Sequence, residues 1–282
     1  MKLDGKKIVL TGGASGIGLC ILNELMQFDV EVVVADLTEL KNEHPRISYF
    51  KADLSNEAGN AALFDFAIEK FGHIDLFIAN AGFAYYEKVE QEDWERLNRI
   101  YKTNVFAPIY TAYRMARINK GRPYAVYITA SLMAYYNIPG YAIYGSTKAS
   151  LHSWASVWDL EHSDQGNLGI IYPVATKTKF FESAANNVPQ IWPTQTAEVV
   201  GRKVVKGILA GKRRIFPSYL SLLTLLCQHI FPWTMTGYLL WMKRKLEKWA
   251  ALNKLKTASK STISSAEESA KEKKGQDYRA TS

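Results

Sequence analysis

Tyr144 and Lys148, four residues apart, are the side chains of this 282-residue sequence best suited to acid–base chemistry. In a helix this spacing places both on one face. A free tyrosine has a pKa near ~10 and is a poor base at neutral pH, but an adjacent ammonium favours the phenolate and lowers that pKa. The pair could therefore give a proton to a carbonyl oxygen or take one from an alcohol. Ser131, thirteen residues before Tyr144, could hydrogen-bond the same oxygen and stabilise a developing alkoxide.

A glycine-rich turn, Thr11-Gly12-Gly13-Ala14-Ser15-Gly16-Ile17-Gly18, lies between an apolar strand and a helical pattern. Its glycines permit a tight turn and let backbone N–H groups approach a pyrophosphate at the start of the helix. Asp36 ends the second strand, where a carboxylate can accept hydrogen bonds from both hydroxyls of an adenosine ribose. Asp36 would repel a 2′-phosphate and its neighbour Leu37 offers no cation, so we expect NAD, with NADP disfavoured. The positive ring of the oxidised cofactor would lower the pKa of Tyr144 further.

The sequence resembles the short-chain dehydrogenase/reductase (SDR) family over about residues 5–215. The glycine spacing with its leading threonine, an Asn-Ala-Gly motif and a Tyr-x-x-x-Lys pair carry the resemblance, in the family's order. It implies a cofactor site made of Thr11, Gly12, Ser15, Gly16, Ile17, Gly18, Asp36, Asp53, Leu54, Asn80, Ala81, Gly82, Tyr144, Lys148, Pro173 and Thr178. It also implies that Asn104 joins Ser131, Tyr144 and Lys148 in catalysis, by holding a water that links the lysine to solvent.

The sequence departs from the family pattern at Val174. In Pro173-Val174-Ala175-Thr176-Lys177-Thr178 the family has a glycine after the proline, followed by a threonine that contacts the nicotinamide carboxamide. Thr178 keeps the threonine position. A β-branched residue disfavours a positive φ, so we expect the backbone near Val174 to run differently from the family's.

Short runs rich in Val and Ile alternate with helical patterns through the first 170 residues. We expect strands over 8–10, 30–35, 47–52, 74–79, 124–129 and 168–172, and helices over 17–28, 58–71, 94–118 and 142–162. Helices of ten or more residues between strands indicate crossover connections and a parallel sheet covered on both faces. The predicted fold is α/β, a doubly wound parallel sheet in a Rossmann-type three-layer sandwich. A polar loop over 176–195, a helix over 196–209 and a short strand at 214–216 come after these elements.

The chain is expected to comprise three regions. These are an NAD-binding Rossmann-type catalytic domain over 1–215, an apolar C-terminal extension over 216–250, and a disordered basic tail over 251–282. Residues 216–242 contain no Asp, Glu, Lys or Arg, and Pro217 and Pro232 leave 14 residues between them. A spanning helix needs about 20 apolar residues. Two compatible roles stay open: a lid over the substrate pocket, and a patch that contacts a membrane interface peripherally through 216–248.

Charge and cysteine content exclude several classes of protein. The net charge is +8, but residues 243–282 hold 11 Lys or Arg against 5 Asp or Glu, and the rest is nearly neutral. A basic tail on a neutral body does not resemble a nucleic-acid-binding face. Two cysteines and five scattered histidines give no metal site. No signal-peptide pattern comes after Met1, so we expect a cytoplasmic location, with membrane association left open.

These features predict an NAD(P)-dependent enzyme that interconverts a secondary alcohol and a ketone on a lipophilic small molecule, with Tyr144 as acid and base. Aromatic residues could wall an apolar pocket: Tyr135, Tyr136, Phe180 and Phe181. The alternative is a non-catalytic dinucleotide-binding or scaffolding protein of the same fold, which loss of Tyr144 or Lys148 would have indicated. An epimerase or dehydratase acting on a nucleotide sugar usually has a larger substrate domain. The resemblance implies a homodimer or homotetramer assembled through the helices around 92–118 and 142–162.

Overall fold

Seven parallel strands form the central sheet of the computed structural model. Their order is β3-β2-β1-β4-β5-β6-β9. They are β1 (Lys7–Thr11), β2 (Glu31–Asp36), β3 (Ile47–Lys51), β4 (Leu76–Ala79), β5 (Ala125–Thr129), β6 (Asn167–Ile171) and β9 (Arg214–Ile215). The strand order reverses beside β1, which pairs with both β2 and β4. Such a reversal leaves a crevice at the carboxyl ends of the strands, where ligands bind in folds of this kind.

The structure describes most of the chain up to residue 253. The described residues are 1–41, 44–136, 138–162, 166–178, 180, 184–185, 187–189, 191–231, 233 and 235–253. The predicted disordered tail over 251–282 lies outside them from residue 254 onward. Residues 251–253 are helical.

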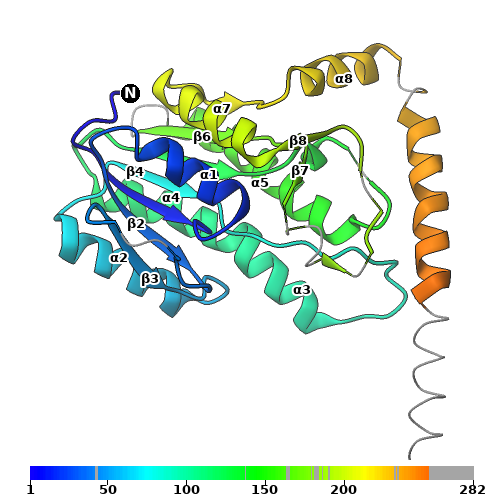
Figure 1. The fold of residues 1–282 in the computed structure, drawn as a ribbon, viewed down its shortest axis with the longest axis horizontal. Coiled ribbons are helices and arrows are strands. Elements are labelled where there is room, and N and C mark those ends of the chain that lie inside the picture. The colour runs from blue at the N-terminus through cyan, green and yellow to red at the C-terminus, as the bar shows by residue number, and fades with distance from the viewer. Residues whose placement is uncertain are drawn as a thin grey trace, which may run out of the picture.

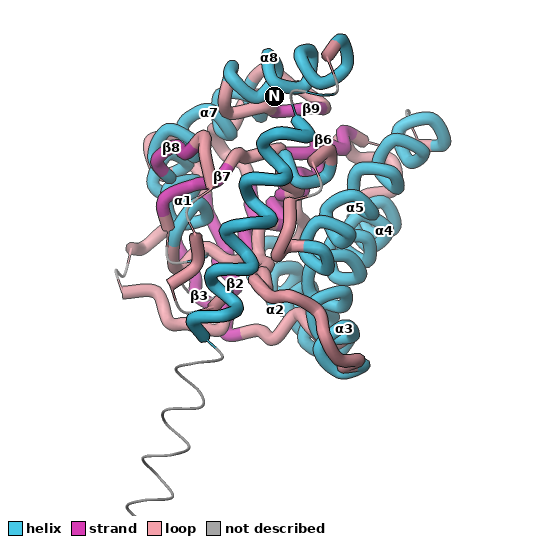
Figure 2. The backbone as a smooth tube through the Cα atoms, turned by 90° about the vertical axis from the view of Figure 1, so that its right-hand side faces the viewer, coloured by secondary structure: helices cyan, strands magenta, loops and turns pink. Residues whose placement is uncertain are grey.

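Helices cover both faces of the sheet, as the sequence predicts (Figures 1 and 2). On one face α1 (Gly16–Leu25) packs with α7 (Ala197–Leu209), and on the other lie α2 (Glu57–Phe71), α4 (Ala107–Ile118) and α5 (Ala142–Glu161). Each face of the sheet has its own apolar core, and alternate side chains along a strand pack into one or the other. Val9 and Val33 pack into one core, and Leu10 and Val34 pack into the other. Both faces of the strands are buried because crossover helices lie over each of them. The result is the expected three-layer sandwich.

The long helix predicted over 94–118 is interrupted. α3 (Trp94–Tyr101) and α4 are joined by a π-helical turn over Lys102–Phe106. An extra residue in a helical turn shifts the register of the next turns of the helix, and such insertions occur frequently at functional sites. Asn104 lies within this π-helical turn.

The predicted loop over 176–195 contains two short parallel strands, β7 (Ala175–Lys177) and β8 (Thr194–Thr196). After β9, α8 (Tyr219–Ile230) and a helix over 235–253 complete the described chain. The helix over 235–253 runs past the body of the domain, at the right in Figure 1 and in front in Figure 2. Its Met242 and Leu246 are buried in a third apolar cluster that also contains Tyr144.

Candidate active site

A cavity of about 1130 Å³ lies at the carboxyl ends of the strands. Residues at or just after the ends of five strands line it: Gly12 after β1, Asp36 at the end of β2, Asn80 after β4, Ser131 after β5 and Pro173 after β6. Of the predicted site residues, all but Thr11 and Asn104 line this one cavity. The parallel sheet brings them together because its carboxyl ends share one edge.

Gly12 and Gly18 of the glycine turn are packed too closely to carry a side chain. Gly12 has a φ of +67°, and a Cβ there would lie 2.8 Å from the Cα of Ala81. A Cβ on Gly18 would lie 1.9 Å from the carbonyl oxygen of Gly12. α1 begins directly after this turn, and the side chain of its N-cap, Ser15, makes no capping hydrogen bond. The turn therefore aims an uncapped helix N-terminus at the cavity, as a pyrophosphate requires.

Asp36 faces the glycine turn with its carboxylate. Its Oδ2 accepts a hydrogen bond from the backbone N–H of Ala14 at 3.0 Å, and its Oδ1 accepts one from Thr38 at 3.0 Å. Each carboxylate oxygen has a second lone pair that could accept a ribose hydroxyl. Lys41 also lines the cavity. The sequence did not indicate this cation: the positions that it offers beside the ribose, Ala14, Ser15 and Leu37, are uncharged, and Lys41 lies five residues beyond Asp36.

Asp53 and Leu54 come shortly after β3 and line the same end of the cavity. The backbone N–H of Ser55 donates to Asp53 at 2.9 Å, and this hydrogen bond lowers the pKa of the carboxyl below its ordinary value. The Asp53 side chain is therefore ionised at neutral pH and held in one orientation. Such a fixed acceptor suits a residue of the cofactor site that the family resemblance implies.

Asn80 ties the ends of three strands together. Its Nδ2 donates to the carbonyl oxygens of Thr11 at 3.2 Å and of Gly12 at 3.1 Å, and its Oδ1 accepts from the Thr129 hydroxyl at 3.2 Å. The Thr11 hydroxyl accepts the backbone N–H groups of Asn80 and Ala81, each at 3.0 Å. Thr11 thus positions the glycine turn against β4 and does not itself line the cavity.

Lys148 is buried beside the end of β5. Only 4% of the residue is exposed, and its Nζ donates to the carbonyl oxygen of Thr129 at 2.8 Å. Burial lowers the pKa of the amine to about 7 because a charged ammonium loses its hydration there. The Nζ lies 5.6 Å from the centre of the Tyr144 ring. No sequence pattern singles out Thr129, whose carbonyl orients the amine.

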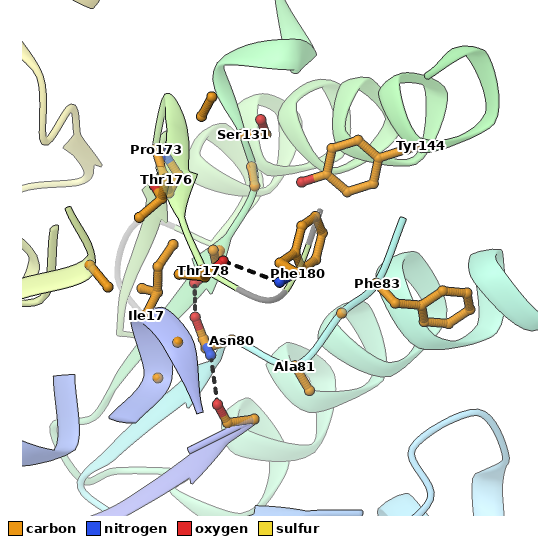
Figure 3. A pocket seen from close by; sticks show the side chains of 18 of the residues that line it. Ile17, Asn80, Ala81, Phe83, Ser131, Tyr144, Pro173, Thr176, Thr178 and Phe180 are labelled. Atoms are coloured by element: carbon orange, nitrogen blue, oxygen red, sulfur yellow. Dashed lines mark hydrogen bonds between the residues drawn. The ribbon is translucent and has the colours of Figure 1, made fainter. Parts of the chain in front are cut away.

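Tyr144 is 6% exposed, and its hydroxyl points toward Ser131 (Figure 3). Burial raises the pKa of the phenol, and hydrogen bonding with Ser131 opposes the rise. The sequence-based expectation was the opposite, a pKa lowered by Lys148 and the oxidised cofactor. In the chain by itself, burial is the larger effect because it disfavours the phenolate.

The Ser131 hydroxyl can donate toward the cavity. Its Oγ accepts the backbone N–H of Met133 at 3.1 Å, at the start of the short helix Leu132–Ala134. Because a hydroxyl has one hydrogen to give, this contact fixes the oxygen and leaves the O–H for another acceptor. A carbonyl oxygen placed between Ser131 and Tyr144 could receive hydrogen bonds from both.

Asn104 lies behind the cavity wall. Its Oδ1 accepts the N–H of Phe83 at 3.1 Å, and its Nδ2 donates to the carbonyl of Phe83 at 2.8 Å and to the Thr147 hydroxyl at 3.2 Å. A Cβ on Gly82 would lie 3.0 Å from this Oδ1 and 3.6 Å from the Nζ of Lys148. Asn104 therefore braces the Asn-Ala-Gly segment close to the lysine.

The segment after β6 closes over the site. Val174 is buried and does not have a positive φ, so its β-branched side chain is accommodated without strain. The Thr178 hydroxyl accepts the N–H of Phe180 at 3.3 Å (Figure 3), and a Cβ on Gly16 would lie 3.4 Å from Thr178 Cγ2. The Phe180 ring packs against Tyr144, with centroids 5.6 Å apart.

Apolar side chains wall the remaining part of the cavity. Of the predicted aromatic walls, Tyr136 and Phe180 line it, and Phe181 lies outside the described residues. Tyr135 instead packs against Tyr172, with ring centroids 5.4 Å apart. Further lining residues not singled out from the sequence include Ile191, Thr224, Cys227, Met235 and Tyr238. Because the last four come from 216–242, the C-terminal extension forms part of the pocket wall.

Known proteins match this chain over most of its length. The family model for short chain dehydrogenases matches residues 6–188. A short chain dehydrogenase/reductase of Aspergillus novofumigatus is 23% identical over 197 residues, 66% of this chain and 75% of the relative. An SDR from Burkholderia phymatum in complex with NAD superposes with a TM-score of 0.72 at 20% identity, covering 81% of this chain and 94% of its own. A short chain dehydrogenase from Burkholderia cenocepacia J2315 in complex with NADP gives 0.73 at 19% identity, covering 85% and 99%.

Proposed function

Since this chain belongs to the short-chain dehydrogenase family of NAD(P)-dependent oxidoreductases, we propose that it interconverts a secondary alcohol and a ketone on a lipophilic small molecule. One observation carries the proposal. The phenol of Tyr144, the hydroxyl of Ser131 and the amine of Lys148 share a single cavity with the glycine turn. A nucleotide bound at the turn and a small molecule at the phenol would therefore lie next to each other.

The chain's own residues supply binding and proton transfer. The cofactor, held by the glycine turn, Asp36 and the Asn80 segment, would supply or accept the hydride. Ser131 donates a hydrogen bond to the substrate oxygen, and Tyr144 gives that oxygen its proton during reduction. Burial keeps the phenol protonated at neutral pH, which is the form that donates. Lys148 lies behind the tyrosine, and its amine, with a pKa of about 7, can exchange a proton near neutral pH.

NAD is the proposed coenzyme. The Asp36 carboxylate lies at the cavity edge, held by the N–H groups of Ala14 and Thr38. A 2′-phosphate bound there would meet a like charge, although Lys41 also lines the cavity. We expect kcat/KM to be higher with NADH than with NADPH. A tenfold preference for NADPH would refute the proposal.

The substrate class is inferred from the walls of the cavity near Tyr144. This region is lined by apolar and aromatic side chains: Met133, Tyr136, Ile138, Phe180 and Ile191. An apolar pocket with few polar groups binds mainly apolar ligands and uses the polar groups to orient them. Ser131 and Tyr144 would orient one oxygen, and the rest of the molecule would contact apolar surface.

A reductase assay against a panel of ketones, with nicotinamide fluorescence as the readout, tests this function. We expect turnover of hydrophobic ketones, and loss of turnover in Tyr144→Phe without loss of NADH binding. If wild type bound NADH but turned over no alcohol or ketone, the chain would be a dinucleotide-binding or scaffolding protein instead. If wild type did not bind NADH or NADPH, both functions would be refuted.

We also propose that the chain assembles as a homodimer or homotetramer through α4 and α5. Both helices expose large apolar side chains: Tyr113 on α4, and Val157 and Leu160 on α5 are half or more exposed. Aromatic and aliphatic residues gathered in this way favour an interface between subunits. Light scattering after size exclusion should give a multimer, and Leu160→Asp should lower its mass.

A further inference from the structure

Most large apolar side chains of α8 face outward, although Leu225 packs inward against the third apolar cluster. Ser221 is 0% exposed, whereas Leu223 is 55% exposed and Leu226 is 56% exposed. The outward side continues through other large side chains, all more than a third exposed: Tyr219, Leu220, Leu222, Ile230, Phe231 and Trp233. A surface helix in water normally turns its apolar side inward. This helix turns it outward, which suits an apolar medium.

The inward side of α8 contacts the rest of the domain and lines the cavity. The Thr224 hydroxyl accepts a hydrogen bond from Tyr136 at 3.0 Å and donates one to the carbonyl of Ser221. Thr224 and Cys227 line the cavity, whose wall also includes Tyr136. The polar side is thus fixed by contacts with the site, and rotating the helix to bury its leucines would break them. The outward leucines are a consequence of how α8 forms the cavity wall.

Cationic residues precede and follow the uncharged segment that contains α8 in the sequence. Lys212, Arg213 and Arg214 precede the uncharged segment and are exposed, and Lys243 and Arg244 come after it and are exposed. On the neighbouring helix α7, the Nζ of Lys203 lies 4.3 Å from the centre of the Tyr219 ring. Apolar side chains bordered by lysine and arginine match a bilayer surface, where acyl chains lie below anionic headgroups.

Exposed tryptophans occur in the same part of the chain. Trp233 comes shortly after α8, and Trp241 is on the helix over 235–253. The Nζ of Lys245 lies 3.6 Å from the centre of the Trp241 ring. Tryptophan is enriched at the boundary between headgroups and acyl chains, because its ring is apolar and its N–H is polar.

We propose that α8 is a membrane-docking surface that rests in the interface of an anionic bilayer, with the apolar side of Tyr219–Ile230 toward the acyl chains. Among the described helices none is both long and apolar enough to cross a bilayer, so the contact is peripheral. The cavity wall formed by Thr224 and Cys227 lies on the other side of the same helix. Lipophilic molecules dissolved in the bilayer therefore come within one helix diameter of the site. The docking itself does not depend on the reaction proposed above.

Charge argues for a membrane over a second copy of the chain as the occupant of this surface. A symmetric pair would bring two identical sets of cations toward one patch. Anionic headgroups would instead neutralise them, because a negatively charged bilayer surface attracts lysine and arginine side chains near it. The apolar side chains add their burial in the boundary region.

Flotation of the full chain with vesicles tests the proposal. The vesicles are phosphatidylcholine alone, or phosphatidylcholine with about 30% phosphatidylserine. We expect wild type to float with the anionic vesicles and Leu223→Asp to lose at least about tenfold in bound fraction, since a charge would enter the apolar boundary. Val89→Asp is the matched control, because Val89 is 56% exposed but lies in a loop far along the chain from α8. Its binding should equal that of wild type.

Lipid charge gives a second, independent arm. Replacing Lys243→Glu and Arg244→Glu together should reduce binding to the anionic vesicles. The proposal is overturned if wild type stays unbound with both vesicle types, or if Leu223→Asp floats as well as wild type. It is equally overturned if wild type does not float and Leu223→Asp splits a lipid-free dimer, since a second copy would then cover α8. Activity toward any ketone plays no part in these readouts.

Discussion

α7 and α8 are successive helices of the chain and differ in which side faces the protein. α7 buries Val200, Val204 and Ile208 against the sheet and exposes Arg202 and Lys206. α8 buries Ser221 and exposes four of its five leucines, all but Leu225. α7 packs against α1 and an apolar sheet, whereas the inner neighbours of α8 include a polar hydroxyl and a cavity. The comparison shows that the contacts of a helix's inward side fix its rotation. That rotation then determines which side chains face outward.

The same contrast divides the whole molecule. From β1 to α7 the chain places apolar side chains between helices and sheet, and its candidate reactive groups line one cavity at the carboxyl ends of the strands. The extension after β9 has an apolar exterior and contributes one wall of the cavity. Reaction chemistry should therefore depend on the first part, and surface attachment on the second. Four predictions test this division.

Tyr144→Phe should have the largest effect, because it removes the acid of the reaction. General acid catalysis contributes about 10²–10⁴-fold, so kcat should fall by that factor while the vesicle-bound fraction stays as in wild type. Steady-state kinetics and flotation of the same preparation provide the comparison. A variant that lost vesicle binding as well would contradict the division.

Truncating one apolar side chain on each helix should separate α7 from α8. Val204→Ala removes buried methyl groups and should lower the free energy of unfolding by about 2 kcal/mol. Leu223→Ala removes exposed groups and should change it by about 0.5 kcal/mol or less. Urea denaturation in the absence of lipid measures both. Equal losses would mean that the leucines of α8 are covered in solution.

The buried amine of Lys148 should make stability depend on pH. Its pKa is about 7 in the folded chain, below the ordinary 10.5, so between these values the unfolded chain binds a proton that the folded chain does not. The free energy of unfolding should therefore rise with pH, by about 2 kcal/mol from pH 7 to pH 9. Lys148→Met should lack this rise. Lys243→Met, which removes an exposed cation of the extension, should keep it; if both variants kept it, the amine would not be the cause.

Asp36→Ala should give the smallest effect. Losing the carboxylate removes repulsion toward a 2′-phosphate, so the ratio of kcat/KM for NADH over NADPH should fall about tenfold, equivalent to ~1.4 kcal/mol. Lys41→Met is the companion variant, and should raise the ratio because it removes a cation that lines the cavity. An unchanged ratio in Asp36→Ala would mean that groups other than Asp36 determine the preference between NADH and NADPH.

The sequence predicted the sheet and most of the cavity for a local reason. Strand runs, crossover helices and the residue types after each strand are encoded within short segments, and parallel strands bring their ends together. The sequence therefore indicates Asp36, Asn80 and Ser131 as site residues without any knowledge of the geometry. The π-helical turn around Asn104 was missed, since apolar periodicity continues through it and only its backbone hydrogen bonds reveal it. The β7–β8 pair was also missed, because three-residue strands carry too little pattern.

Sequence alone determined the family of the chain and the alternation of its strands and helices, and it singled out Tyr144, Lys148 and Ser131 as candidate reactive groups. Tertiary structure decided the direction in which the pKa of Tyr144 moves, because burial depends on neighbours distant in the chain. It also decided which side of α8 faces outward. Composition showed only that this helix lacks charge, whereas the contact between Tyr136 and Thr224 fixes its rotation and leaves most of its leucines exposed.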